Sequence, residues 1–73
     1  MRQVVIYKGE DGNWVAEVPS LPGCVSQGSS TQQALANVAE AISLWVETVR
    51  EMGWNIPVDS MSARIETIPD PAA

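Results

Sequence analysis

A tight turn between two short strands is predicted by residues 15–28, VAEVPSLPGCVSQG. Pro22 and Gly23 suit the two central positions of a type II turn, because proline presets φ and glycine accepts a positive φ. Residues 14–18 before this turn alternate between apolar and polar side chains, which is typical of a strand with one buried face. Residues 23–27 after it are predicted to form the next strand.

The strand nearest the N-terminus is predicted at residues 3–8, which are rich in β-branched and aromatic side chains. Residues 9–13, GEDGN, follow as a hairpin loop, so the first three strands form an antiparallel meander. The adjacent carboxylates Glu10 and Asp11 are explained by this loop, since no third ligand stands at a spacing that would hold a metal ion.

A long helix is predicted between Ser30 and Gly53. Ser30 is the expected N-cap, and Gln33 completes a capping box by reaching back to the Ser30 amide. Gly53 is the natural residue to follow the last helical turn, and Pro57 prevents the helix from continuing. Apolar residues recur at steps of three and four along one side, as a core-facing stripe does: Leu35, Val38, Ile42, Trp45, Val49 and Met52.

Residues 63–68, ARIETI, alternate again and predict a fourth strand. The helix carries the chain back across the sheet, so this strand is expected to lie parallel to the first, with the helix on one face. The predicted fold is therefore α+β, with the order β-β-β-α-β and the other face of the sheet open. Residues 1–68 form a single domain in this prediction, and residues 69–73 form a disordered C-terminal tail.

The composition argues against an enzyme. The 73 residues contain no histidine and one cysteine, so neither a Ser–His nor a Cys–His pair can form. The strand order is similar to that of the ribonuclease H core, but residues 3–8 lack the carboxylate that metal-dependent hydrolysis uses in the first strand of that family. We expect no catalytic residue, no cofactor and no metal.

Size and charge favour a binding role. A chain of 73 residues forms a marginal core by itself, and self-association or a partner would stabilise it. The net charge of −5 repels nucleic acid and favours a basic partner, although acidity also keeps a small protein in solution. No segment resembles a signal peptide or a membrane span, and one unpaired cysteine suits a reducing compartment, so we expect a cytoplasmic protein without membrane contact.

The outer side of the predicted helix is the candidate partner-binding surface. At about 100° per residue, Glu40, Glu47 and Glu51 lie nearly opposite the apolar stripe. Leu44 falls among these three glutamates. An exposed leucine ringed by acids would suit a basic partner with an apolar dimple, although single exposed leucines are common and need no such explanation.

Two kinds of side chain allow more than one interpretation. Cys24 is interpreted as a small buried hydrophobe and not as a reactive thiol, because no cationic residue nearby in sequence would lower its pKa. Trp14 and Trp45 are expected in the core. Trp54, just beyond the helix, is expected either to cap the core as the C″ contact of a Schellman ending or to lie in an interface.

Residues 15–28, followed by Thr31, Ala34-Leu35, Asn37 and Glu40-Ala41-Ile42, resemble the HicB-type antitoxin family. The Leu-Pro-Gly-Cys turn, with a glycine soon after it and then a helix, is the most specific part of the resemblance. It covers the chain from the first strand to about residue 57. The resemblance implies a partial ribonuclease H-like fold without nuclease activity.

The resemblance also implies a function. Members are antitoxins of type II toxin–antitoxin systems that bind a small basic HicA-like toxin, and the toxin cleaves mRNA with a histidine. Many members are dimers or tetramers, and many carry a C-terminal DNA-binding domain. About five residues follow the last predicted strand here, which argues against direct operator binding. The alternative function is an orphan homo-oligomeric regulatory or scaffolding domain without a toxin partner.

Overall fold

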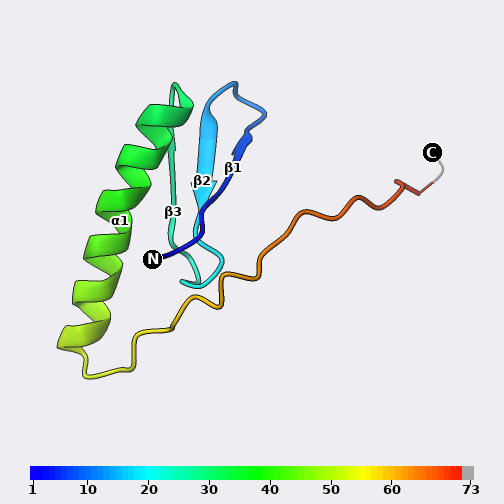
Figure 1. The fold of residues 1–73 in the computed structure, drawn as a ribbon. Coiled ribbons are helices and arrows are strands. Elements are labelled where there is room, and N and C mark those ends of the chain that lie inside the picture. The colour runs from blue at the N-terminus through cyan, green and yellow to red at the C-terminus, as the bar shows by residue number, and fades with distance from the viewer. Residues whose placement is uncertain (72–73) are drawn as a thin grey trace.

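The computed structural model describes residues 1–71 and places three strands and one helix within them. The elements are β1 (Val5–Lys8), β2 (Trp14–Glu17), β3 (Val25–Gly28) and α1 (Thr31–Glu51). The strands form an antiparallel sheet in the order β1-β2-β3, and α1 lies alongside it next to β3 (Figure 1). The predicted α+β class and the three-stranded meander are confirmed.

β1 and β2 form a hairpin in which Val5 is paired with Glu17. The loop between them is closed by a hydrogen bond of 2.7 Å from the Gly9 amide to the Asn13 carbonyl. The Asp11 carboxylate accepts the Asn13 amide at 3.0 Å. Asp11 therefore stabilises the turn locally, as aspartate commonly does.

The turn before β3 agrees with the Pro-Gly prediction. Gly23 has a φ of 79°, and the Cys24 amide donates to the Leu21 carbonyl at 3.0 Å. This is the conformation that a type II turn with Pro22 and Gly23 at its centre requires. The Cys24 carbonyl then accepts the Val18 amide at 3.0 Å, which closes the connection into β3.

The N-terminus of α1 is capped, with one difference from the prediction. Ser30 Oγ accepts the Gln33 amide at 3.1 Å, which confirms Ser30 as the N-cap. The Gln33 side chain accepts the Ser29 amide at 2.6 Å, not the Ser30 amide. Ser29 Oγ donates to the same Gln33 oxygen at 2.9 Å, so Ser29 offers two donors to it. The predicted reciprocal bond is wrong by one residue.

The C-terminus of α1 ends in a Schellman motif. Gly53 has a φ of 74°, and its amide donates to the Arg50 carbonyl at 3.1 Å. The Trp54 amide donates to the Val49 carbonyl at 3.1 Å. These two bonds satisfy carbonyls that the helix leaves without partners, and they confirm Gly53 as the terminating residue.

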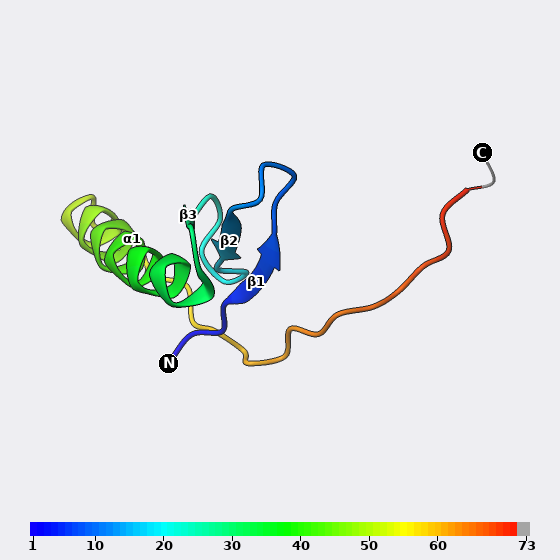
Figure 2. The ribbon, with the colours of Figure 1, turned by 90° about the horizontal axis from the view of Figure 1, so that it is seen from above.

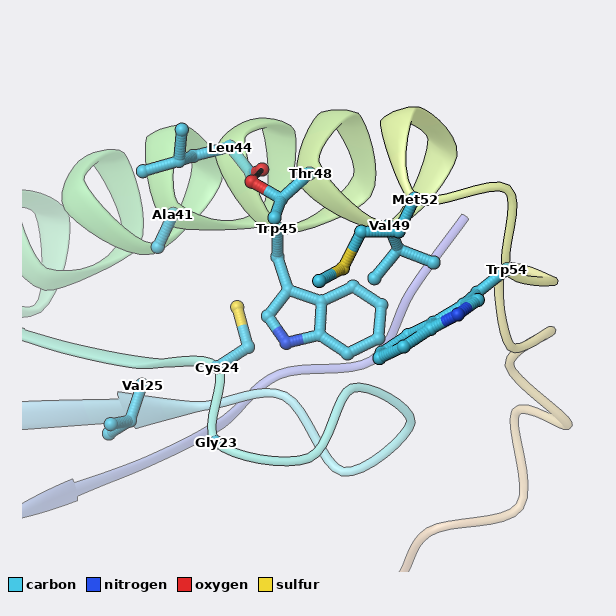
Figure 3. A pocket seen from close by; sticks show the side chains of 10 residues that line it. All are labelled: Gly23, Cys24, Val25, Ala41, Leu44, Trp45, Thr48, Val49, Met52 and Trp54. Carbon is cyan, nitrogen blue, oxygen red and sulfur yellow. Dashed lines mark hydrogen bonds between the residues drawn. The ribbon is translucent and has the colours of Figure 1, made fainter.

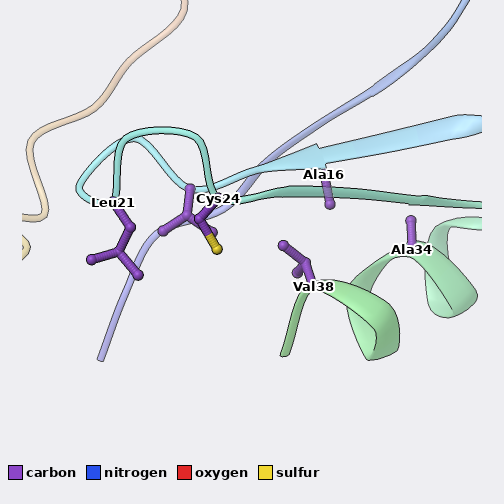
Figure 4. Packing of buried hydrophobic residues seen from close by; sticks show 6 residues of the cluster. Ala16, Leu21, Cys24, Ala34 and Val38 are labelled. Atoms are coloured by element: carbon purple, nitrogen blue, oxygen red, sulfur yellow. The ribbon is translucent and has the colours of Figure 1, made fainter. Parts of the chain in front are cut away.

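The core lies between the sheet and α1, and the backbone of α1 lies close to β3 at Gly28. A Cβ at Gly28 would stand 2.6 Å from the Ala34 nitrogen, so only glycine lets the helix lie this close to β3. The close approach fully buries Ala34, whereas Leu35 is 45% exposed and Met52 is also exposed. The predicted stripe is therefore wrong at both ends. The buried cluster consists of Ala16, Val18, Leu21, Cys24, Ala34 and Val38 (Figure 4).

Residues 63–68 do not form the predicted fourth strand. All six residues are exposed, and no strand ladder within residues 1–71 includes them. The Ala63 amide donates to Gln3 Oε1 at 3.0 Å, and the chain then runs outward, away from the sheet (Figures 1 and 2). Alternation defines the two faces of a strand but not its neighbour, so the pattern alone could not secure pairing. Of the predicted tail, residues 72–73 lie outside the described residues.

Candidate partner-binding groove

An open apolar groove of about 440 Å³ lies between the turn before β3 and the C-terminal half of α1 (Figure 3). Trp45 projects from α1 toward the turn, and its Nε1 donates to the Pro22 carbonyl at 3.1 Å. The buried side chains of Cys24 and Val49 line the groove beside it. The side chains that stay exposed along the groove are Val25, Leu44, Met52 and Trp54.

The Schellman motif positions one wall of the groove. Trp54 occupies the C″ position, and its ring lines the groove together with Val49 and Met52. The ring is nevertheless 64% exposed. Capping the helix therefore leaves most of this aromatic surface open to solvent. Trp14 and Trp45, in contrast, are partly buried and pack against the core, as predicted.

The predicted partner-binding residues border this groove on one side. At about 100° per residue, the three glutamates lie within roughly 60° of Leu44 on one side, while Thr48 and Met52 lie on the other. Leu44 is 67% exposed and lines the groove, so it stands at the boundary between acidic and apolar surface. The exposed acidic ridge consists of Glu40, Glu47 and Glu51.

Within residues 1–71, no ion pair includes the acidic ridge. The one ion pair in this part of the chain joins Arg64 to Glu66 at 2.7 Å. Lys8 lies over the ring of Trp14, 5.7 Å from its centre, on the hairpin. The ridge therefore presents negative charge without a protein counter-charge, and such charge raises the rate of encounter with a basic partner.

The open face of the sheet is the other surface that a partner could use. Val5 and Val15 on this face are half-buried. Tyr7 Oη donates to Glu17 Oε1 at 2.8 Å, and this hydrogen bond, with smaller effects of burial and of the Glu17 charge, raises the pKa of Tyr7. The Tyr7 and Glu17 side chains therefore hydrogen-bond to each other on this face, beside the two half-buried valines.

No three Cys, Asp or Glu side chains converge into a metal-binding set in the described part of the chain, and histidine is absent from the sequence. No helix within residues 1–71 has both the length and the apolar character that crossing a lipid bilayer demands. The groove is therefore the candidate site that we consider further.

The reactivity of the Cys24 thiol tests how tightly the groove is packed around this buried side chain. Burial raises the pKa of the Cys24 thiol, and the charge of Arg2 opposes this to a smaller extent. The thiolate is the reactive form, so a buried thiol with a raised pKa reacts slowly at neutral pH. We expect a thiol reagent to modify Cys24 more than about tenfold faster in denaturant than in the folded protein. Equal modification rates in the folded and the denatured protein would contradict the burial of Cys24.

The fold and the groove together define a small α+β domain with an apolar surface bordered by acids, which suits protein binding. Residues 3–72 match the HicB_like antitoxin family of bacterial toxin–antitoxin systems, and the chain belongs to this family. The family that the Leu-Pro-Gly-Cys turn and the following helix indicated is thereby confirmed.

Several curated relatives share most of the chain. A UPF0150 protein of Thermoplasma acidophilum is 44% identical over 57 residues, which cover 78% of this chain and 83% of the relative. A UPF0150 protein of Archaeoglobus fulgidus is 45% identical over 49 residues, or 67% of this chain and 71% of the relative. A UPF0150 protein of Synechocystis is 35% identical over 65 residues, or 89% and 86%. No solved structure matches the chain.

Proposed function

We propose that this protein neutralises a small basic HicA-like toxin, an mRNA-cleaving ribonuclease, by binding it on the groove and the acidic ridge. The observation that carries the proposal is the exposed apolar groove beside three glutamates that no described cation neutralises. An apolar side chain of the toxin would cover Leu44 and Trp54. Basic side chains around it would meet the ridge.

The two parts of the surface have different energetic roles. Aromatic and large apolar side chains at the centre of an interface supply most of the affinity, and Trp54 is of this kind. Exposed charges at the rim contribute more to the rate of association and to the choice of partner than to affinity. Inhibition then needs no chemistry from the antitoxin, because covering the toxin surface is sufficient. Since the proposed toxin acts on mRNA, the complex would form in the cytoplasm.

Co-expression tests the proposal. A HicA-like basic protein from the same genome, produced alone, should arrest growth, and co-expression with this chain should relieve the arrest and yield a complex that co-purifies. If neither relief nor a complex is observed, the proposal is wrong. The orphan homo-oligomeric domain would then be the better interpretation, and the unpaired outer edge of β1 supports self-association in either case.

The acidic ridge is expected to control the association rate. The double substitution Glu47→Gln/Glu51→Gln should slow association with the basic partner by about three- to tenfold at low salt and weaken its salt dependence, with little change in dissociation. The matched control Glu10→Gln/Asp70→Asn removes the same charge from the hairpin loop and the tail. Surface plasmon resonance at several salt concentrations would measure the association and dissociation rates of both double variants. Identical effects of both pairs would mean that only net charge matters.

A further inference from the structure

The outer edge of β3 carries backbone groups that no other strand pairs. Just beyond β2, the Val18 amide donates to the Cys24 carbonyl at 3.0 Å, so Cys24 directs its carbonyl toward the side of β2. Successive residues of a strand direct their backbone groups to opposite edges. Those of Val25 and Gln27 therefore point away from β2, and the order β1-β2-β3 places no described strand on that side.

Helix α1 covers one end of this edge and leaves the other end open. Asn37 Nδ2 in α1 donates to the Gln27 carbonyl at 2.8 Å, which confirms the outward direction of that carbonyl. A Cβ at Gly28 would stand 2.6 Å from the Ala34 nitrogen, so the helix closes the edge there. At Val25, in contrast, neither the amide nor the carbonyl has a hydrogen bond within residues 1–71. Val25 is therefore the point at which the edge can accept another strand.

The apolar groove reaches this open end of the edge. Cys24 and Val25 both line the groove, and Figure 3 shows the Cys24 side chain pointing toward α1 and the Val25 side chain pointing away from it. A segment laid along the edge alternates in the same way. One of its side chains would enter the groove, and the next would lie on the open face of the sheet. The edge thus joins the two surfaces that a partner can contact.

We propose that an extended segment of the basic toxin adds as a strand to the outer edge of β3 and pairs with the amide and carbonyl of Val25. The proposal rests on the proposed function, and it adds the way in which the partner is held. In strand addition, main-chain hydrogen bonds give affinity and side chains at alternate positions give specificity. Pairing is limited to the Val25 end, because Asn37 already occupies the Gln27 carbonyl.

The surroundings of Val25 define the side chains that the added segment carries. Leu44 and Trp45 line the groove on the α1 side, so the side chains that enter it are apolar. On the open face, Glu17 is the ladder partner of Val25, and no cation within residues 1–71 forms an ion pair with it. The added strand would lie two strand spacings, about 10 Å, from the Glu17 backbone, which a lysine or arginine spans together with the glutamate side chain. The expected pattern is apolar, basic, apolar.

Amide hydrogen exchange tests the pairing in the wild-type protein, alone and saturated with the purified HicA-like basic protein from the same genome. The Val25 amide should exchange at least about tenfold more slowly in the complex. The Ile6 amide is the matched control, because it points away from β2 on the outer edge of β1 and should not change. A complex in which Val25 exchanges as in the free protein would overturn the strand pairing and leave the proposed function standing. The absence of any complex would overturn both.

A proline variant tests the hydrogen bond itself. Val25→Pro removes the proposed donor and no bond of the sheet, because the Val25 amide points outward and proline is tolerated at such edge positions. Binding should weaken by about tenfold or more, since a carbonyl of the partner loses its donor within the interface. Val25→Thr keeps the amide and a similar shape, and it should bind within about threefold of the wild type.

Circular dichroism checks that both variants fold. Wild-type affinity of a folded Val25→Pro protein would overturn the proposal. If the proline variant unfolds, the exchange of the wild-type Val25 amide decides between pairing and no pairing.

Discussion

Gly28→Ala is expected to lower the free energy of unfolding by roughly 3 kcal/mol, at the upper end of what overpacking costs. The added methyl would meet the Ala34 nitrogen at 2.6 Å and the Gln33 carbonyl carbon at 2.9 Å. Both atoms belong to the first turns of α1, so the helix itself would have to move away from β3. Asn37 Nδ2, which donates to the Gln27 carbonyl at 2.8 Å, would lose its position as well.

Urea denaturation followed by circular dichroism measures this effect. A domain of this size has a total stability of about 4–11 kcal/mol, so a loss of roughly 3 kcal/mol is a large fraction of it. Gly12→Asn is the matched control, because Gly12 has open space around it and asparagine tolerates its positive φ of 86°. The control should change stability by less than about 1 kcal/mol. A Gly28→Ala protein as stable as the wild type would contradict the close approach of α1 to β3.

Leu44→Arg is expected to weaken binding of the basic toxin by at least about thirtyfold, or about 2 kcal/mol. The arginine would replace apolar surface at the boundary of the groove and would lie within pairing distance of Glu40 or Glu47, one turn before and one turn after it. It therefore both blocks the groove and neutralises the ridge. Because Leu44 is mostly exposed, the free fold should remain intact.

Leu35→Arg is the matched control for this substitution. Leu35 is also an exposed leucine of α1, but it does not line the groove, and at about 100° per residue it points to the opposite side of the helix from Leu44. Both variants change the net charge equally. Calorimetric titration should show weak binding for Leu44→Arg and wild-type binding for Leu35→Arg. If Leu44→Arg binds normally, the toxin uses another surface, such as the open sheet face or the turn at Pro22.

Local signals in the sequence predicted most of the fold correctly. Pro22-Gly23, Ser30 and Gly53 act through their own backbone conformations and nearest neighbours, so their roles did not depend on the rest of the chain. The fourth strand depends on a neighbouring edge far away in sequence, and the alternation of residues 63–68 carries no information about that edge. This prediction therefore failed within the single chain.

The candidate site was only half predictable. Helical periodicity placed Glu40, Leu44, Glu47 and Glu51 on the exposed side of α1 correctly, and their role in binding stays a prediction. The groove was missed because the periodicity of large side chains assigned Met52 to the core and did not select Ala34. The signal that existed was Gly28, since a glycine before a helix with alanine at its first turn permits close packing there. Met52 and Trp54 are exposed at the other end of the helix.

We propose that this chain inhibits a basic ribonuclease by binding its surface. The most direct measurement is a titration of mRNA cleavage by the purified toxin with the purified protein. We predict that cleavage falls in proportion to the added protein and stops at a fixed ratio of the two, and that Leu44→Arg shifts inhibition to much higher concentrations. Cleavage that continues undiminished in a large excess of the wild-type protein would contradict the account.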